Sequence, residues 1–417
     1  MGVKEGYQQT EFGTFPADWD LVPVGDLFTF KNGLNKAKQF FGHGTPIVNY
    51  MDVYNHPALR VSMIEGKVDV TPKEQQAYEV LKGDVFFTRT SETVDEIGTA
   101  SVMLDETDST VFSGFVLRAR PTDISLEDQF KAYCFQPKYF RDQVISRSSY
   151  TTRALTNGKS LSAATLARPP KPEQIAIADV LYDIDKTLSE IDKMIAKKRD
   201  VKVAAAQQLL TKERRLKGFD SPWRKEKVGK LVKIRNEKTV TLHMEIAKFC
   251  VELDSIGKGT AQLNSHSDAS NRLSSLYSFK AGDVLFGRLR PYLRKYWYAT
   301  NDGVCSTEIW PLIPSADEIV PEYLFHTVRT EGFINAASSS YGTHMPRSDW
   351  GALVEFEIEI PISLDEQREI SKVLSDMDGE ISSLQHRRDK VFDLKSAVAH
   401  ELLNGKTRLP VERTIDD

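Results

Sequence analysis

The feature that most constrains this chain is a stretch of 44 residues whose composition favours one long helix. Residues 173–216 contain neither glycine nor proline, so nothing inside them interrupts a helix. Apolar residues recur at alternating steps of four and three, which is the spacing of a coiled-coil seam rather than of an ordinary surface helix. The seam comprises Ile177, Leu181, Ile184, Leu188, Ile191 and Ile195. A helix of this length is roughly 60 Å long, far longer than the core of a small domain requires.

A second copy of this stretch follows at an offset of 193 residues. Residues 366–409 match residues 173–216 at 17 of 44 positions without a gap, far more than shared helical composition would produce. The second seam comprises Ile370, Leu374, Met377, Ile381 and Leu384, followed by Val391, Val398 and Leu402. Arg388 and Lys395 interrupt this seam, so we expect that part of it to be wetter. The duplication predicts two helices that pack on each other, in place of two unrelated core helices.

A globular segment precedes each helix, and these segments also repeat one another. Each opens with a tryptophan, Trp19 or Trp223. Each contains a Gly-Asp turn that leads into an apolar strand, Gly83–Arg89 or Gly282–Arg288. Further predicted elements are a strand at 46–53 and a helix at 126–146. Short strands mixed with one or two helices predict a compact α+β domain of roughly 150 residues.

The chain therefore divides into two similar domains, each followed by a long helix. The expected boundaries are 1–172 for the first domain, 173–217 for the first helix, 218–362 for the second domain, 363–409 for the second helix and 410–417 for a tail. Pro172 suits a first helical turn. Ser363 and Glu366 have the spacing of a capping box, and Gly405 suits a C-terminal stop.

Composition bounds the class of protein. At 417 residues, 40% apolar and 10% aromatic, the chain has enough apolar material for two or more folded domains. Its three cysteines, Cys134, Cys250 and Cys305, show no metal-ligand spacing, which favours a reducing, intracellular compartment. We find no apolar signal region and no run of about 18 apolar residues, so we expect neither secretion nor membrane insertion. The net charge of −4 counts mildly against a nucleic-acid binder, although local patches matter more.

The order domain–helix–domain–helix resembles that of the DNA specificity subunits of type I restriction–modification enzymes. The resemblance rests on the W-x4-VG opening, the repeated GD-V-x-F-x-R strand, the EQ-x-x-I start of each helix and the closing Leu-Leu pair, and it covers nearly the whole chain. In that family the two globular domains are target recognition domains, and each reads one half of a split DNA site. The helices form an antiparallel pair that sets the distance between the half-sites, and the subunit has no catalytic activity.

The resemblance also implies partners. The subunit would bind double-stranded DNA with a split recognition site and carry two methyltransferase subunits, and separate motor–nuclease (restriction) subunits would join for restriction. S-adenosylmethionine, ATP and Mg²⁺ are expected on those partners, and no cofactor or metal is expected in this chain. The resemblance implies a cytoplasmic protein with no membrane partner, which takes part in DNA methylation and in defence against foreign DNA.

Elementary geometry supports the same arrangement. Two similar domains joined by a rod have pseudo-twofold symmetry, and half-sites on duplex DNA match this symmetry best when the axis is perpendicular to the DNA. The twofold rotation reverses the direction of a helix that runs along the DNA, so the two helices are expected to be antiparallel. The predicted fold is therefore α+β, with two domains and two long helices packed as an antiparallel coiled coil.

The richest candidate DNA surface is the segment 279–298, where five cations and several aromatics accompany one acid. Cations suit phosphates and guanine edges, and hydroxyl groups suit phosphates and base edges. The candidates are Arg89, Thr90, Ser91, Arg147, Ser148, Tyr150, Thr151 and Arg153 in the first domain and Arg288, Arg290, Tyr292, Arg294, Lys295, Ser339, Tyr341, Thr343, His344 and Arg347 in the second. The alternative for each is an ordinary solvated side chain, and for Tyr296 and Trp297 we favour a core position.

Patterns for enzymatic activity are weaker. Residues 40–44 fit the F-x-G-x-G pattern of a methyl-donor site, but the Pro-Pro pair at 169–170 does not follow an Asn or Asp, so we do not predict a base methyltransferase. Asp52 with residues 65–67 fits a Mg²⁺ nuclease constellation only loosely. The sequence contains no Walker-type phosphate loop, and its eight histidines form neither an H-x-x-x-H pair nor a cluster with cysteine.

Two functions remain. The first is a non-catalytic DNA-recognition subunit that positions methyltransferase subunits on a bipartite site. The alternative is a coiled-coil interaction scaffold whose globular domains bind proteins. Salt-dependent, sequence-selective binding to duplex DNA would discriminate them, because phosphate contacts weaken with salt.

Overall fold

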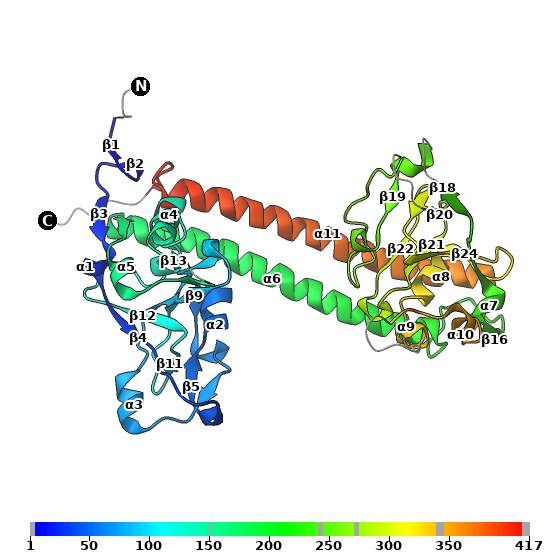
Figure 1. Ribbon diagram of the computed structural model, residues 1–417, viewed down its shortest axis with the longest axis horizontal. Coiled ribbons are helices and arrows are strands. Elements are labelled where there is room, and N and C mark those ends of the chain that lie inside the picture. The colour runs from blue at the N-terminus through cyan, green and yellow to red at the C-terminus, as the bar shows by residue number, and fades with distance from the viewer. Residues whose placement is uncertain (1–4, 151, 241–244, 271–274, 339–345, 411–417) are drawn as a thin grey trace. The chain divides into compact units, whose positions relative to one another are not determined.

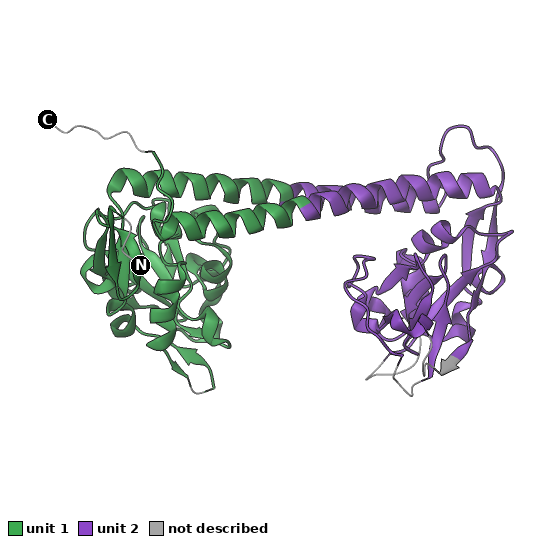
Figure 2. Ribbon diagram, turned by 90° about the horizontal axis from the view of Figure 1, so that it is seen from above, with its two compact units in different colours: residues 1–191, 387–417 green, residues 192–386 purple. Residues whose placement is uncertain are grey.

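Two helices of 40 residues run through the computed structural model of this chain: α6 covers Lys171–Leu210 and α11 covers Leu364–Leu403 (Figure 1). The structure describes residues 5–150, 152–240, 245–270, 275–338 and 346–410. The chain divides into two units, residues 1–191 with 387–417 and residues 192–386 (Figure 2). Each long helix therefore contributes one end to each unit.

The globular part of the first unit is an α+β domain built on a five-stranded sheet with the order β4–β12–β8–β10–β6. Smaller sheets have the orders β11–β5–β7, β13–β14–β9, β1–β2 and β15–β3. The strands are β1 (Tyr7–Thr10), β2 (Gly13–Pro16), β3 (Asp20–Pro23), β4 (Phe28–Asn32), β5 (Phe41–Val48), β6 (Ala58–Leu59), β7 (Lys67–Val68), β8 (Val85–Thr88), β9 (Thr90–Ser91), β10 (Ala100–Met103), β11 (Val111–Phe112), β12 (Val116–Pro121), β13 (Ser149–Tyr150), β14 (Ala154–Leu155) and β15 (Thr165–Arg168). The shorter helices are α1 (Val24–Leu27), α2 (Tyr50–Asn55), α3 (Pro72–Ala77), α4 (Lys138–Ser146) and α5 (Gly158–Ser162).

The second unit repeats this α+β plan with a four-stranded sheet of order β17–β24–β21–β22. A second sheet has the order β18–β20–β23–β19, and β16 pairs with β25. The strands are β16 (Trp223–Lys227), β17 (Val232–Ile234), β18 (Lys238–Val240), β19 (Cys250–Val251), β20 (Ser275–Phe279), β21 (Val284–Gly287), β22 (Tyr296–Tyr298), β23 (Gly303–Cys305), β24 (Ile309–Pro314) and β25 (Glu357–Pro361). The shorter helices are α7 (Val228–Leu231), α8 (Pro321–Thr327), α9 (Glu331–Ser338) and α10 (Trp350–Leu353).

Strands β8 and β21 lie at the centres of the two domain cores. Each begins with three successive apolar residues, which allows burial on both faces. Both strands are buried along their whole length. Successive side chains of a strand point to opposite faces. Accordingly, Val85 and Phe87 lie in one core cluster of the first domain and Phe86 in another. In the second domain, Val284 and Phe286 lie in one cluster and Leu285 in another. A strand covered on both faces is a nearly continuous apolar run, here Val85–Phe87 and Val284–Phe286.

Two predicted elements need correction. The predicted strand at 46–53 ends at Val48, because Asn49 caps α2: its N–H donates to the carboxylate of Asp52 (2.8 Å). The predicted helix at 126–146 is broken. A short 3₁₀ turn covers Phe130–Ala132, and α4 begins only after Pro137, which cannot extend a helix that precedes it.

The predicted seams lie on the inner faces of the long helices. On α6, Ile177, Leu181, Leu188, Ile191 and Ile195 are buried and Ile184 is half-buried. On α11, Ile370, Leu374, Ile381 and Leu402 are buried, while Met377, Leu384, Val391 and Val398 are half-buried. The part of the second seam that Arg388 and Lys395 interrupt, with Val391 and Val398, is half-buried, in agreement with the prediction of a wetter part. Among the residues that the structure describes, neither these helices nor any other is apolar enough over sufficient length to cross a bilayer.

Both long helices end six residues earlier than the duplicated stretch does. α6 stops at Leu210 and α11 at Leu403, so residues 211–216 and 404–409 are not helical. The stop predicted at Gly405 is confirmed, whereas the boundaries expected at 217 and 409 lie too far along the chain. The stop is the same in both copies: Lys212 and Gly405, at equivalent positions, both adopt a left-handed φ of 63°. Glycine adopts this conformation without strain and commonly terminates helices. The lysine in the first copy hides the same stop from sequence reasoning.

A buried glutamate fastens the start of α6. The carboxylate of Glu173, which is 1% exposed, accepts the indole N–H of Trp19 (2.9 Å). It also accepts two hydrogen bonds from Arg408, which follows the end of α11 (2.6 and 2.8 Å). Arg408 in turn binds Asp18. One carboxylate therefore joins the opening of the domain, the start of one long helix and the end of the other.

The second unit repeats this junction around Glu366. Its fully buried carboxylate accepts the indole N–H of Trp223 (3.2 Å) and two hydrogen bonds from Arg215, which follows the end of α6 (3.0 and 2.7 Å). The hydroxyl of Ser363 accepts the N–H of Glu366 (3.3 Å), which is half of the predicted capping box. The other half is absent from the described contacts because the carboxylate is turned toward the tryptophan and the arginine.

Polar pairs show that the helix segments run antiparallel in each unit, and the colour gradient along α6 and α11 shows the same opposite directions (Figure 1). In the first unit, Asp185 of α6 pairs with Lys395 of α11 (2.6 Å), and the pair Glu173–Arg408 lies further along in the opposite sense. In the second unit, the contacts are Lys198–Glu380 (2.6 Å), Lys202–Asp378 and Arg215–Glu366. Residue numbers fall on α11 as they rise on α6, which confirms the predicted antiparallel order within each unit.

Replacing Glu173 with glutamine should destabilise the first unit, because Arg408 and Trp19 would lose a charged acceptor. A hydrogen bond to a charged group is worth about 1.5–3 kcal/mol. Urea unfolding of the whole chain, followed by circular dichroism, should therefore show a transition at lower urea. Glu190→Gln, an exposed change on the same helix, should shift stability by no more than about 0.5 kcal/mol. Equal behaviour of the two variants would contradict this role for the buried carboxylate.

Candidate nucleic-acid interface

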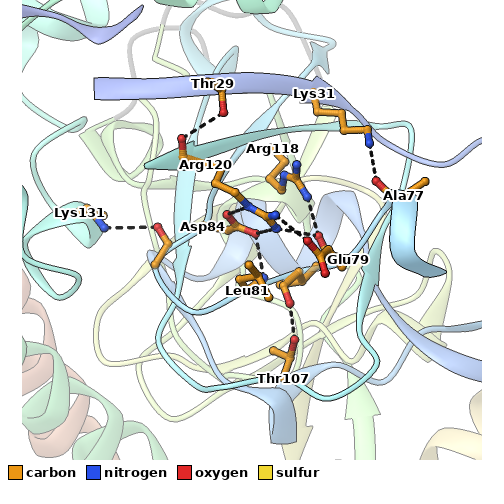
Figure 3. Close-up of polar contacts among 12 residues, drawn as sticks. Thr29, Lys31, Ala77, Glu79, Leu81, Asp84, Thr107, Arg118, Arg120 and Lys131 are labelled. Atoms are coloured by element: carbon orange, nitrogen blue, oxygen red, sulfur yellow. Dashed lines mark hydrogen bonds and ion pairs between the residues drawn. The ribbon is translucent and has the colours of Figure 1, made fainter. Parts of the chain in front are cut away.

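The acid of the first Gly-Asp turn holds the strand that leads to the candidate residues. Buried Asp84 accepts the N–H of Leu81 (2.8 Å) and binds the guanidinium of Arg120 through Nε (2.9 Å) and Nη2 (2.8 Å) (Figure 3). These bonds raise the pKa of Arg120 above its ordinary value. Glu79 accepts Nη1 of Arg120 (2.7 Å), and its carbonyl accepts Nη1 of Arg118 (2.7 Å). These two arginines are therefore used to tie β12 to the turn.

The second domain uses the same device with an arginine from a different strand. Buried Asp283 accepts the N–H of Lys280 (2.9 Å) and binds Arg235 through Nε (2.9 Å) and Nη2 (3.1 Å). The preceding glycines, Gly83 and Gly282, have φ of 82° and 90°. This left-handed conformation favours glycine. The Gly-Asp motif thus has a structural role, and what it positions is the strand end that follows.

The first strand end brings two separately predicted groups together. Arg89 follows β8; its N–H donates to the carbonyl of Phe115 (3.2 Å), and its carbonyl accepts the N–H of Thr156 (3.0 Å). Directly beyond it, β9 pairs with β14, and β14 pairs with β13. The candidates at 89–91 and the described candidates among residues 147–150 and 153 therefore border one small sheet, which the sequence alone did not show.

The side chains on this small sheet differ in how free they are. Tyr150 is 60% exposed, and Arg153 is exposed with its guanidinium 3.6 Å from Glu92. Arg147 and Ser148 donate to carbonyls of the last turn of α4 (3.2 and 2.7 Å). The exposed tyrosine and the exposed arginine are thus the side chains best placed to reach a ligand.

The second strand end has the same main-chain geometry. Arg288 follows β21; its N–H donates to the carbonyl of Glu308 (2.9 Å), and its carbonyl accepts the N–H of Ser348 (2.8 Å). Two residues later, the N–H of Arg290 donates to the carbonyl of Pro346 (2.8 Å). The backbone bonds of Arg89 and Arg288 therefore correspond one to one.

A short 3₁₀ turn, Pro291–Leu293, carries the most exposed candidates of the second domain. Arg290 precedes it in a left-handed conformation (φ 51°) and is exposed, and Tyr292 within it is 55% exposed. Arg288 lies behind them, with its guanidinium 5.3 Å from the ring centre of Trp310. Within the described residues its buried Nε has no hydrogen-bond partner. An arginine held against an aromatic ring in this way keeps donors available for a ligand.

Two further arginines, exposed Arg347 and half-buried Arg294, are already paired. Arg347 binds Glu308 through Nε (3.1 Å) and Nη2 (2.8 Å), which raises the pKa of Arg347. Arg294 binds Glu331, which likewise raises the pKa of Arg294. Exposed ion pairs contribute little to stability, so both arginines could exchange a carboxylate for a phosphate at low cost.

Burial removes two residues from the proposed contact set. Ser91 is 4% exposed, and its hydroxyl is bonded to Glu96 (3.3 Å). Lys295 is 7% exposed, and its ammonium donates to the carbonyl of Leu253 (2.8 Å) and to Asp254 (3.0 Å). A basic run in the sequence does not show which of its lysines is turned inward.

Two aromatic residues of this region lie in the core, and five further candidates lie outside the described residues. Tyr296 and Trp297 are buried, as predicted for core residues. The candidates Thr151, Ser339, Tyr341, Thr343 and His344 lie outside the described residues, and their role stays a prediction.

Phe115 is a candidate that sequence reasoning missed. It is 63% exposed and lies beside Arg89, whose N–H its carbonyl accepts. The residue at the same backbone position of the second domain is Glu308. Aligning residues 113–121 with 306–314 reveals this contrast, because an aromatic stands in one copy where an acid stands in the other.

The loose nuclease pattern also has a structural explanation. The carboxylate of Asp52 accepts the N–H of Asn49 and so completes a capping box at the start of α2. A Cβ on Gly66 would collide with the side-chain amide of Asn49. The absence of a side chain at Gly66 is therefore explained by packing.

Fold and surface together define a duplicated scaffold protein, in which two α+β domains present corresponding strand ends and each leads into a long helix. The family model of the type I restriction modification DNA specificity domain matches this chain twice, at residues 16–198 and 221–391, and the chain belongs to this family. It is a specificity subunit, which is a non-catalytic component of these enzymes.

Similar proteins carry the corresponding description. The type I restriction enzyme MjaVIII specificity subunit of Methanocaldococcus jannaschii is 20% identical over 97% of each chain. The putative MjaX specificity subunit of the same organism is 22% identical over 50% of this chain and 49% of its own. The EcoDI specificity subunit of Escherichia coli is 33% identical over 23% of this chain and 21% of its own.

Solved structures show the same fold. The type I S subunit of M. genitalium covers 96% of this chain and 98% of its own, with a TM-score of 0.57 and 13% identity. A second structure, reported in work on complex assembly and conformational transition of the type I system, covers 94% and 99% with a TM-score of 0.55 and 14% identity.

Arg290→Ala should weaken DNA binding while leaving the fold intact, because alanine and arginine meet the same backbone constraint at a left-handed φ. If the guanidinium grips a base pair with two bonds, the loss is about 1–3 kcal/mol on the cognate duplex only. An equal loss on unrelated duplexes would instead indicate a phosphate contact. Fluorescence anisotropy of the chain assembled with its methyltransferase subunits measures the affinity for the cognate duplex and for unrelated duplexes. Arg214→Ala, an exposed arginine outside this surface, is the control, and an unchanged affinity of Arg290→Ala would exclude the residue from the interface.

Proposed function

We propose that this chain recognises a bipartite duplex DNA sequence, with each domain reading one half-site at its strand end. The observation that carries the proposal is the repetition of one main-chain frame around Arg89 and Arg288 with different side chains on it. Phe115 stands where the second domain has Glu308. A shared frame with different surface chemistry is what two readers of different half-sites require.

The chemistry of these surfaces supports DNA as the ligand. Arginine offers paired donors that match guanine edges and phosphates. Hydroxyl groups can form hydrogen bonds with phosphates and with base edges. Arg290, Tyr292 and Tyr150 are exposed, and the exposed residues Arg153 and Arg347 form ion pairs with Glu92 and Glu308. Because the net charge is −4, binding would depend on these local groups rather than on the charge of the whole chain.

The chain would act by holding other subunits on the DNA. We propose two methyltransferase subunits and, for restriction, motor–nuclease subunits as its partners, with S-adenosylmethionine, ATP and Mg²⁺ bound by them. The long helices offer apolar surface for such docking: Val201 and Val203 on α6 and Phe392 and Leu394 on α11 are between 47% and 70% exposed. Methyl transfer should therefore appear only when a methyltransferase partner is present.

Exchanging one domain tests whether the half-sites are read independently. Replacing residues 223–360 with the corresponding domain of a relative should change one half of the methylated motif and preserve the other. Methylation sequencing in a host without other methyltransferases reads both halves at once. A change in both halves would contradict independent reading, and the exchange of residues 16–168 is the reciprocal control.

The helices are proposed to fix the distance between the half-sites. Each long helix has one end in each unit, and the buried junctions at Glu173 and Glu366 attach a domain at each end. A change in helix length should therefore change the spacing of the DNA sequence that is read.

Four residues inserted after Lys198 should lengthen the unspecified spacer by one or two base pairs. The insertion adds roughly 6 Å of helix and turns it only about 40° beyond a full revolution, so the seam can re-form as a stutter. DNA rises about 3.4 Å per base pair. A two-residue insertion turns the seam to the opposite face and should mainly destabilise the chain. Methylation sequencing decides between these outcomes, and an active four-residue variant with the original spacer would remove the helices from this role.

A further inference from the structure

A cavity of about 350 Å³ in the second unit shares only Arg294 and Val203 with the surfaces discussed above. It lies between α6, α11, the loop at 258–260, the start of β22 and the end of α8. Its lining contains five cations: Arg199, Lys202, Lys258, Arg294 and Arg329. The acid among the lining residues is Asp378. The walls are thus strongly cationic although the chain as a whole is acidic.

The floor of this cavity carries two cations for one carboxylate. Asp378 accepts two hydrogen bonds from Arg329 (2.6 and 3.1 Å) and is also bonded by Lys202. The side chains of Arg329 and Lys202 are only 13% and 12% exposed. Burying a charge without a full counter-charge is costly. A bound anion would offset the excess positive charge on the floor.

The neighbouring side chain of His326 does not supply a negative charge, and Lys202 is itself one of the two cations. His326, which also lines the cavity, is bonded to Ser375 (3.0 Å). Burial, and then the charge of Arg329, lowers the pKa of His326 to about 3, so the ring is neutral at physiological pH. Burial, and then Arg329, also lowers the pKa of Lys202 to about 8. Asp378 alone therefore does not fully stabilise the charged lysine.

The first unit provides an internal comparison, because its equivalent aspartate is balanced. Asp185 accepts the ammonium of Lys395 (2.6 Å) and the hydroxyl of Tyr133 (3.0 Å). Lys395 is the duplicate of Lys202, and Asp185 is the duplicate of Asp378. One cation thus meets one carboxylate in the first unit, whereas Arg329 adds a second cation in the second.

We propose that this cavity binds a small phosphate-bearing anion of the size of a mononucleotide. Arg199 and Lys258, both exposed at the rim, would meet the phosphate together with Lys202, since arginine and lysine are the usual phosphate ligands. Val203, Ala206 and the other apolar lining residues would cover the less polar part of the ligand. A volume of about 350 Å³ lies within the range of small-molecule sites.

Calorimetry on the full chain tests the proposal with AMP, inorganic phosphate and uncharged adenosine as probes. AMP should bind with one-to-one stoichiometry, phosphate more weakly, and adenosine at least tenfold more weakly than AMP. Lys202→Met leaves the Arg329–Asp378 pair intact, and Arg199→Ser changes an exposed residue, so both variants should fold. Each should weaken AMP at least tenfold.

Lys395→Met is the matched control, because it removes the duplicate lysine of the first unit and should leave AMP binding unchanged. Equal weakening by Lys395→Met, or AMP affinity that ignores Lys202→Met and Arg199→Ser, would overturn the assignment. Absence of AMP binding at millimolar concentration would also overturn it. Displacement of AMP by a short non-cognate duplex would place the DNA backbone in the cavity and would overturn the choice of a small phosphate.

Discussion

The buried carboxylates of Glu173 and Glu366 are the interactions on which the remaining structure depends. A buried charge is tolerated only when it is paired and hydrogen-bonded. Each carboxylate finds its partners in a domain's opening tryptophan and in an arginine beyond the end of the other long helix. The domain opening, the helix start and the other helix's end must therefore assemble together. This requirement couples the folding of each domain to both long helices of its unit.

Ion pairs inside the helix contacts then select the register. Apolar seam residues alone would tolerate sliding by a heptad, since every step presents similar side chains. The pairs Asp185–Lys395 and Lys202–Asp378 exist at one register in each unit. Buried ion pairs are weak evidence for stability, and setting register is the best-attested use of buried polar groups. Arg329, which adds a second cation at Asp378, goes beyond what register requires.

Local sequence patterns predicted most of the fold. Contacts between residues far apart in the sequence could not be predicted in this way. Heptad spacing and duplication predicted the helices, and the Gly-Asp turns predicted the central strands. The end of the first helix was misplaced because Lys212 adopts a left-handed conformation that is unusual for lysine, whereas Gly405 marked the end of the second helix. The exposure of a surface candidate depends on neighbours distant in sequence: the ammonium of Lys295 is turned inward to Leu253 and Asp254. Exposed Phe115 lay in a stretch that predicted only a strand.

The strand ends show how one framework can carry different specificities. The frame around Arg89 and Arg288 consists of main-chain hydrogen bonds, to Phe115 in one domain and to Glu308 in the other. Side chains do not take part in those bonds, so they can change without loosening the frame. The aspartates of the Gly-Asp turns hold each strand from its opposite end. Variation at positions such as 115 and 308 is therefore decoupled from folding, which allows a recognition surface to change while its support is kept.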